Sequence, residues 1–272
     1  MTVFDFLTCP ICKKPLFLQS GSLVCESGHT YDVAKSGYVN LTNTSSQKES
    51  GDSKEMADAR RAFLDSGAYS RFRDAIIDAA ATSKIVLDAG CGEGYYTAGV
   101  ARACDAALGF DLSKSAVMKA SKRAKAEGVS DKTFFGVGSV FSLPVADGCA
   151  DCVTSIFAPC AEDEFLRVLK PGGILVVGCA GKRHLEGLKR ELYDNVRENT
   201  ERADLPTQME KLDRINVSYD IKLTGSEQIK NLYMMTPYCY KTGIDAQKRL
   251  LSLDTLDTLV DFEIHIYRKG TR

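Results

Sequence analysis

Between residues 84 and 180 the chain alternates short, continuously apolar segments with segments whose apolar residues recur every three or four positions. The apolar segments read "KIVLDAG", "AALGFDL", "TFFGVGS", "DCVTSIFA" and "GGILVVGCA". Strands are apolar throughout when helices cover both faces of a parallel sheet. Strand–helix alternation with right-handed crossovers therefore predicts a doubly wound α/β domain.

The flanking segments complete this division of the chain. Apolar spacing predicts helices over 56–81, 182–199 and 225–235, whereas 211–223 and 259–269 read as extended. Residues 40–55, "NLTNTSSQKESGDSKE", are polar and nearly free of large apolar groups, which is typical of a linker. We therefore expect a small β domain over 1–40, a linker over 41–55 and the α/β domain over 56–272.

The small domain contains two pairs of soft metal ligands. Cys9 and Cys12 are spaced C-x2-C, Cys25 and His29 are spaced C-x3-H, and twelve residues separate the pairs. A C-x2-C turn points both sulfurs the same way, so the four side chains complete a closed tetrahedron for one structural Zn²⁺. Metal binding is then expected to supply much of the folding free energy of so small a domain. A redox-active C-x2-C is the alternative, but that motif normally opens a helix, and no helical pattern follows.

A glycine-rich turn follows the first parallel strand, in "VLDAGCGEGYYT". Gly90, Gly92 and Gly94 allow a tight turn and bring backbone N–H groups close to a ligand at the start of a helix. The spacing G-x-G-x-G departs from the dinucleotide fingerprint G-x-G-x-x-G, and it suits S-adenosylmethionine, which has no pyrophosphate. The structural alternative is that these glycines merely close a tight turn between strand and helix.

Acidic residues accompany this turn. Asp88, at the end of the strand, is expected to receive the amino group of S-adenosylmethionine, directly or through water. Asp111 ends the next strand, 17 residues after Gly94, and is expected to accept the ribose hydroxyls. Glu93 and Leu112 adjoin these positions and complete the expected cofactor contacts.

Composition restricts the setting in which the protein works. Its net charge of −1 predicts no globally basic surface, so any contact with nucleic acid must be local. No stretch approaches the roughly 20 apolar residues of a membrane span, and "MTVFDFLT" lacks the features of a signal peptide. Several of the ten cysteines stand singly inside apolar segments, as in a reducing compartment. We expect a cytoplasmic protein without a membrane partner.

The combination of these regions resembles the bacterial 23S rRNA (guanine-N1)-methyltransferases of RlmA type over almost the whole chain. The shared segments are "CPIC", "GHTYDVAKSGYVNL", "GDSKEMADARRAFLDSGAY", "VLDAGCGEGYYT", "IFAPC", "LKPGG", "RHL" and "MTPY". The resemblance implies a zinc-binding RNA-recognition domain before a class I, Rossmann-like methyltransferase domain with a seven-stranded, mostly parallel sheet. It also implies transfer of a methyl group from S-adenosylmethionine to N1 of a guanine in a domain II hairpin loop of 23S rRNA. The sequence leaves the oligomeric state open, and analogy with this family suggests a homodimer that shares one RNA cleft.

The same resemblance adds two cofactor contacts outside the glycine turn. Tyr69, in "SGAY", and His184, in "KRHL", match positions that contact the cofactor in this family. The alternatives are a core aromatic residue on an amphipathic helix for Tyr69 and an exposed loop residue for His184.

The segment "SIFAPC" at the end of the fourth strand is expected to face the transferred methyl group. Phe157 is predicted to stack on the target base, and carbonyls around Ala158 and Pro159 to hold the edge of that base. Phe157 cannot accept a proton, and no residue is assigned as the general base. A covalent role for Cys160 is not expected, because N1 methylation needs no enzyme adduct.

RNA requires local positive charge. Two segments are basic, 113–132 and 182–197, and the second follows the fifth strand close to the expected catalytic mouth. The predicted phosphate contacts in it are Lys182, Arg183, Lys189 and Arg190. The first segment is expected to lie on the solvated face of a helix.

Two other functions remain open at this stage. A small-molecule S-adenosylmethionine-dependent methyltransferase would share the glycine turn and "LKPGG", but it leaves the zinc ligands unexplained. A non-catalytic zinc and RNA-binding protein would not need Asp88, the glycine turn and Asp111 together.

Overall fold

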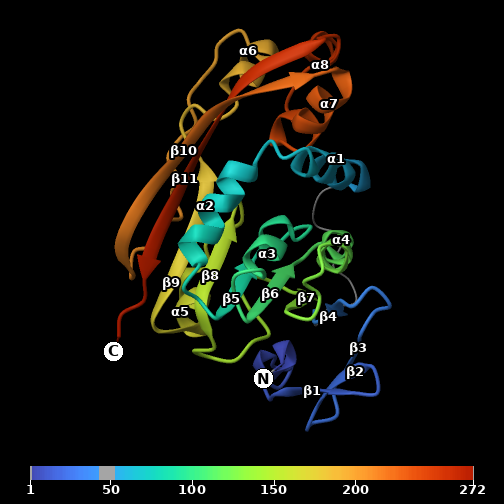
Figure 1. Ribbon diagram of the computed structural model, residues 1–272, viewed down its shortest axis with the longest axis vertical. Coiled ribbons are helices and arrows are strands. Elements are labelled where there is room, and N and C mark those ends of the chain that lie inside the picture. The colour runs from blue at the N-terminus through green and yellow to red at the C-terminus, as the bar shows by residue number, and fades with distance from the viewer. Residues whose placement is uncertain (1, 43–52, 272) are drawn as a thin grey trace.

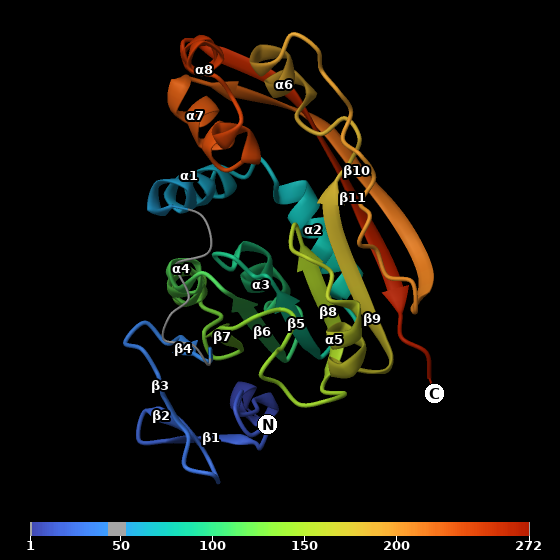
Figure 2. The same ribbon diagram turned by 180° about the vertical axis from the view of Figure 1, so that it is seen from behind.

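The computed structural model describes residues 2–42 and 53–271 and is built around one eight-stranded sheet (Figures 1 and 2). In spatial order its strands are β10 (Glu210–Thr224), β11 (Thr255–Arg268), β9 (Leu169–Ala180), β8 (Ala150–Ile156), β5 (Ile85–Ala89), β6 (Ala106–Asp111), β7 (Thr133–Val137) and β4 (Val39–Asn40). The strands from β9 to β4 are parallel, and β11 and β10 add antiparallel pairs at the other edge. The doubly wound, mostly parallel sheet is confirmed, but it has eight strands instead of the expected seven, because β4 of the N-terminal segment pairs with β7.

Helices cover the sheet because its strands are apolar on both faces. Neighbouring residues of one strand, such as Val86 and Leu87, belong to different core clusters. The first cluster includes side chains of α2 (Ser70–Ala80), α3 (Tyr95–Val100) and α4 (Lys114–Ala126), and the second includes side chains of α5 (Glu162–Val168). Two separate cores on the two faces explain why the strands lack apolar–polar alternation.

The N-terminal segment takes the place of a covering helix on the second face. Val3 and Phe6, in the short 3₁₀ helix η1 (Val3–Phe6), are buried in the second core cluster with Phe134 of β7. Leu7 pairs with Val145 through an isolated β-bridge. Since β4 also extends the large sheet, the expected boundary at residue 40 does not separate two independent cores.

The remaining N-terminal strands form a small antiparallel sheet of β1 (Leu16–Gln19), β2 (Ser22–Cys25) and β3 (Thr30–Asp32). Figures 1 and 2 show this sheet at one end of the molecule, beside β4 and β7. The opposite end holds α6 (Glu186–Leu192), α7 (Ser226–Met234) and α8 (Ile244–Leu251). The residues between α7 and α8 include the short 3₁₀ helix η2 (Pro237–Tyr240).

Several element boundaries differ from the expectations. The helical segment 56–81 is two helices, α1 (Lys54–Asp65) and α2, and α1 begins early because the Ser53 hydroxyl accepts a hydrogen bond from the Met56 N–H (3.3 Å). The predicted helix over 182–199 is only α6, because Asn199 instead folds back and donates to the Gly181 carbonyl (2.8 Å). The predicted linker falls mainly on 43–52, outside the described residues.

No helix within residues 2–42 and 53–271 combines the length and apolar character needed to span a bilayer.

Candidate functional site

The four predicted metal ligands lie together at the small N-terminal sheet, and one of them, Cys25, ends its strand β2. Their ligand atoms are all within 4.8 Å of one another. The Cys12 and Cys25 sulfurs are 3.6 Å apart, and His29 Nδ1 lies 3.5 Å from the Cys9 sulfur and 3.3 Å from the Cys25 sulfur. Tetrahedral zinc with its usual bond lengths separates such ligand atoms by about 3.5–3.8 Å. The donor set therefore fits zinc with no position left open.

Two turns build this cluster. The Cys9 N–H donates to the Lys14 carbonyl (2.8 Å), and Lys13 adopts a positive φ of 61°. At the second pair, Gly28 has a φ of 83°, and the Cys25 N–H donates to the His29 carbonyl (3.1 Å). A backbone hydrogen bond from Lys14 lowers the pKa of the Cys12 thiol, which favours the thiolate form that binds metal.

The three glycines after β5 meet two different demands, although all have positive φ values. A Cβ atom on Gly90 would collide with the Cβ of Ala158, and one on Gly94 would lie 2.8 Å from the Cβ of Ala120. Around Gly92 the space within 4 Å is open. Gly90 and Gly94 therefore permit close packing, and only Gly92 faces an open cavity.

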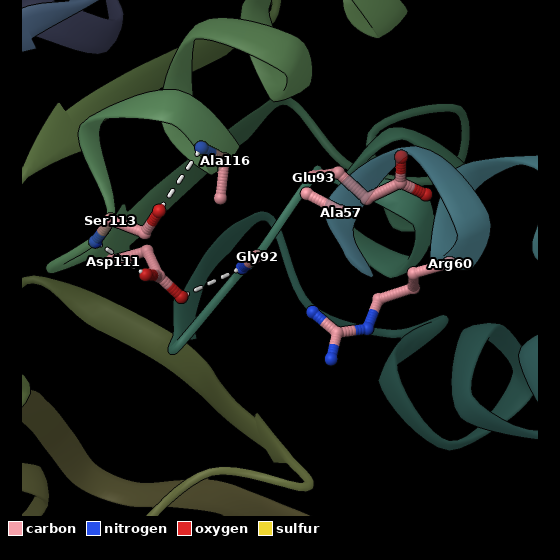
Figure 3. Close-up of a pocket in the computed structure, with 7 residues that line it drawn as sticks. All are labelled: Ala57, Arg60, Gly92, Glu93, Asp111, Ser113 and Ala116. Atoms are coloured by element: carbon pink, nitrogen blue, oxygen red, sulfur yellow. Dashed lines mark hydrogen bonds between the residues drawn. The ribbon is translucent and has the colours of Figure 1, made fainter. Parts of the chain in front are cut away.

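That cavity is a pocket between the glycine turn, the end of β6 and helix α1 (Figure 3). Its lining residues are Ala57, Arg60, Gly92, Glu93, Asp111, Ser113 and Ala116. The Asp111 carboxylate accepts hydrogen bonds from the N–H groups of Gly92 (3.0 Å) and Ser113 (2.8 Å). Asp111 is thereby held at the carboxyl end of β6, where ligands of open parallel sheets bind.

Glu93 supplies the second carboxylate of the pocket. One of its oxygens accepts a hydrogen bond from Arg123 (2.9 Å), and the other is buried without a hydrogen-bond partner among the described residues. Burial raises the pKa of Glu93. That second oxygen is closed to solvent, so in this structure the Glu93 carboxylate supports the pocket wall through Arg123. S-adenosylmethionine brings ribose hydroxyls, for which the Asp111 carboxylate of the lining is a suitable acceptor, so the pocket fits it.

Asp88 lies outside this lining. Its carboxylate is buried and accepts hydrogen bonds from the hydroxyls of Thr97 (2.5 Å) and Thr154 (2.8 Å), and burial raises its pKa to about 6. These bonds join β5 to α3 and β8. In this structure the side chain connects three elements of the core, in contrast to its expected place beside the cofactor. Leu112, the other predicted neighbour, is exposed and is also absent from the lining.

Tyr69 and His184 meet although 115 positions separate them. The His184 Nδ1 atom accepts the Asp261 N–H (3.2 Å), so the proton is on Nε2, which donates to the Tyr69 hydroxyl (3.3 Å). Burial lowers the pKa of His184 to about 3, which keeps the ring neutral. His184 is therefore not the exposed loop residue of the alternative interpretation. Both side chains contact the ring of Phe262 in the core.

The segment after β8 has an unusual backbone. Phe157 adopts a left-handed φ of 55°, yet the residue is 49% exposed, and its ring borders the rings of Phe72 and Phe262. A non-glycine residue in this conformation stores strain, which is common where a side chain must be presented. The exposed aromatic face matches the stacking role expected for Phe157.

The neighbouring carbonyls are less available than expected. The Ala158 carbonyl accepts hydrogen bonds from Arg202 (2.6 Å) and from the Ser155 hydroxyl (3.3 Å). The Pro159 carbonyl accepts only a long bond from the same hydroxyl (3.3 Å) among the contacts described. The Ser155 hydroxyl has a single hydrogen, which these two carbonyls share, so a lone pair remains for a base edge at each of them, although Arg202 takes the other one at Ala158.

The predicted RNA contacts are largely engaged in ion pairs. Lys189 is buried and donates to Asn199 (2.7 Å), so it supports the fold and cannot reach a phosphate. Arg183 and Arg190 both pair with Glu186. Lys182 is 53% exposed and 3.5 Å from Glu201.

The other basic segment also differs from its expected solvated state. Arg123 of α4 is buried and pairs with Glu93, Asp65 and Glu127. Lys119 of the same helix pairs with Asp58 of α1 (2.5 Å). Lys119 and Arg123 therefore attach this basic helix to α1, and Arg123 also attaches it to the glycine turn.

A second group of metal-type ligands lies on β9 and β11, where Cys179, Glu263 and His265 come together. The Glu263 carboxylate pairs with Arg214 (2.5 Å) and contacts His265 Nε2 (3.1 Å). A guanidinium already balances this charge, so we assign no metal there.

Several residues of the site escaped the sequence analysis. Ser113 carried a usable signal, since a serine directly before a helical pattern is a preferred cap and its hydroxyl accepts the Ala116 N–H (3.3 Å). Ala57 and Arg60 carried none, because only the tertiary placement of α1 brings them to the glycine turn. Arg202 likewise lies in a segment without regular structure.

Comparisons with known proteins agree with this arrangement. A family model described as "Methyltransferase domain" matches residues 86–173, and one described as "RlmA, N-terminal" matches residues 7–50. The 23S rRNA (guanine(748)-N(1))-methyltransferase of Streptomyces fradiae is 37% identical over 195 residues, which are 68% of this chain and 67% of that protein.

The other comparisons separate fold from family. The solved cyclase SpnF covers 76% of this chain and 83% of its own, with a TM-score of 0.50 and 21% identity, and so indicates the fold alone. The Bacillus subtilis (strain 168) protein YxjB, which its name assigns to the 23S rRNA (guanine-N(1)-)-methyltransferases, is 32% identical over 285 residues, or 98% of each chain. The chain therefore belongs to the 23S rRNA (guanine-N1)-methyltransferase family.

Proposed function

We propose that the protein transfers a methyl group from S-adenosylmethionine to N1 of a guanine in a domain II hairpin loop of 23S rRNA. The observation that carries the proposal is the four-ligand Cys/His cluster packed on the same sheet as an acidic cofactor pocket. Similarity over 98% of the Bacillus subtilis relative extends across both parts.

In this proposal different residues of the pocket bind different groups of the cofactor. Asp111 accepts the ribose hydroxyls, and Glu93, which also lines the pocket, is the second acidic contact. Arg60, on the α1 wall, places positive charge where a carboxylate can be bound (Figure 3). The bound cofactor supplies an electrophilic methyl group, so the protein mainly has to align donor and acceptor.

The acceptor side is assigned to the segment after β8. Guanine N1 lies on the Watson–Crick edge, so the base must be unpaired or extruded before it can react. Phe157 offers an exposed aromatic face for stacking, and the Pro159 carbonyl can accept a hydrogen bond from the base. Burial raises the pKa of Cys160 to about 11, so its thiol is protonated at neutral pH and is not a nucleophile.

The zinc site is proposed to be structural, with one Zn²⁺ bound by Cys9, Cys12, Cys25 and His29. All ten cysteines are free, which accords with a reducing, cytoplasmic setting. Lys13 and Lys14 are exposed beside the metal ligands, and Lys13 contacts the Ser142 hydroxyl (3.4 Å). These two lysines support an RNA contact of the zinc module near the loop that follows β7. A homodimer with a shared RNA cleft remains part of the proposal.

The proposed reaction is tested by primer extension on 23S rRNA from cells with and without the gene. An N1-methyl group blocks base pairing, so reverse transcription should stop at one guanine only when the gene is present. Purified protein should restore the stop on rRNA from the deletion strain. A small-molecule methyltransferase, the second candidate, would leave the rRNA unchanged in both experiments.

Replacing Lys182 and Arg183 by Ala together should raise the KM for the rRNA hairpin and flatten its salt dependence. Each lost phosphate contact lowers the slope of log affinity against log salt by about 1. The measurement is hairpin affinity over a series of salt concentrations. Lys230→Ala, which removes an exposed lysine of α7, serves as the matched control. An unchanged KM and slope in the double variant would place the RNA on a different face.

A further inference from the structure

The segment Arg202 to Gln208 has no helix or strand, yet side-chain hydrogen bonds attach it to the end of β8 and the start of α5. Arg202 donates to the Ala158 carbonyl (2.6 Å), and Asp204 accepts the Cys160 N–H (3.0 Å). Further along, Glu162 accepts the N–H groups of Thr207 (2.8 Å) and Gln208 (2.6 Å). Segments more than 40 positions apart are therefore joined at three successive points.

Arg202 and Asp204 are themselves paired. The guanidinium contacts both carboxylate oxygens, at 2.6 Å and 2.9 Å, and the Arg202 side chain is only 13% exposed. The hydrogen bonds from Arg202 lower the pKa of Asp204 to about 2, so the pair remains charged at neutral pH. Two hydrogen bonds between the same two side chains fix the relative orientation of Arg202 and Asp204 as well as their separation.

The backbone that this pair holds is the one that presents Phe157. Phe157 lies in the left-handed region, and such strain persists only where surrounding contacts maintain it. Its own N–H donates to the Gly178 carbonyl (3.0 Å) on one side. On the other side Arg202 holds Ala158, which precedes Pro159, and Asp204 holds Cys160, which follows it. Gly90 packs against Ala158 without room for a Cβ atom, so the same backbone also borders the glycine turn.

We propose that Arg202 and Asp204 are positioning residues, which hold residues 157–160 in the geometry needed to stack and align the target guanine. This inference rests on the proposed function, because it assigns Phe157 to the acceptor base. Neither residue lines the cofactor pocket, so their loss should affect the methyl-transfer step more than cofactor binding.

A kinetic experiment measures the methyl-transfer step and cofactor binding separately. Arg202→Ala should lower kcat on the rRNA hairpin roughly 10- to 100-fold, because small misplacements of reacting groups carry costs of this size. The Kd for S-adenosylmethionine should stay near that of the wild type. Arg202→Lys retains the positive charge but cannot form both hydrogen bonds to Asp204, so it should recover only part of the rate. Asp204→Asn should have a kcat similar to that of Arg202→Lys. Arg214→Ala, which removes an arginine paired with Glu263 rather than with Asp204, is the matched control and should retain full activity.

A second readout needs no RNA. The chain contains no tryptophan, so Phe157→Trp introduces a single fluorophore into the segment itself. In that background Arg202→Ala should lower the fluorescence anisotropy and increase quenching by acrylamide, whereas Arg214→Ala should change neither. Unchanged fluorescence together with wild-type kcat in Arg202→Ala would overturn the positioning role. A wild-type protein that fails to methylate the hairpin would instead contradict the proposed function, and the fluorescence result would still decide the role of Arg202.

Discussion

Removal of the metal is expected to destabilise the whole protein rather than its first 40 residues alone. The side chains of Val3, Phe6 and Leu7 belong to the same core cluster as residues of β6 and β7. β4 is also a strand of the large sheet. If the module around Cys9, Cys12, Cys25 and His29 loosens, apolar surface on that face of the sheet becomes exposed to water.

Chelation of zinc should lower the free energy of unfolding by at least about 4 kcal/mol, the stabilisation that a ligand gives at a thousand times its Kd. Cys12→Ala should produce a similar loss, since three ligands cannot close the tetrahedron. Urea unfolding followed by far-ultraviolet circular dichroism measures the effect, and metal analysis of protein purified without added metal should find one zinc per chain.

Cys149→Ala provides the control, because it removes a half-buried free cysteine outside the cluster. Its unfolding midpoint should move far less than that of Cys12→Ala. Two separate transitions, with only the smaller one sensitive to chelator, would show that the N-terminal module unfolds independently. Folded protein that contains no metal would contradict the zinc site itself.

The order of strands and helices could be predicted because local patterns determine it. Continuous apolar runs such as 174–180 identify strands covered on both faces, and the glycine spacing at 90–94 identifies the turn that begins the pocket. The zinc ligands were equally accessible, since four ligands within 21 residues must lie close together wherever the chain goes.

What escaped prediction depends on contacts between distant segments. Spacing alone cannot show that Asp88 binds two threonine hydroxyls or that Lys189 is buried against Asn199. The neighbouring sequence does not show whether a charged side chain faces solvent or pairs with a residue from a distant segment. The contact between Arg202 and the Ala158 carbonyl was hidden for the same reason, because 44 positions separate the two residues.

Asp111→Ala should weaken the binding of S-adenosylmethionine by about 1.5–3 kcal/mol, the range for a hydrogen bond to a charged group. That loss corresponds to a roughly 10- to 150-fold higher Kd. The carboxylate has two functions, because it is also the acceptor for the N–H groups of Gly92 and Ser113. Asp111→Asn keeps one acceptor oxygen but lacks the charge, so its Kd should lie between those of the wild type and Asp111→Ala.

Calorimetric titration of the RNA-free protein measures these affinities directly. Asp105→Ala is the matched control, since it removes an exposed aspartate just before the opposite end of β6 and should leave the Kd unchanged. The unfolding midpoints of both variants distinguish loss of a ligand contact from loss of the glycine turn. If Asp111→Ala binds the cofactor with wild-type affinity while it remains folded, the ribose is held elsewhere. Glu93 would then be the next residue to test, because it is the other carboxylate in the pocket wall.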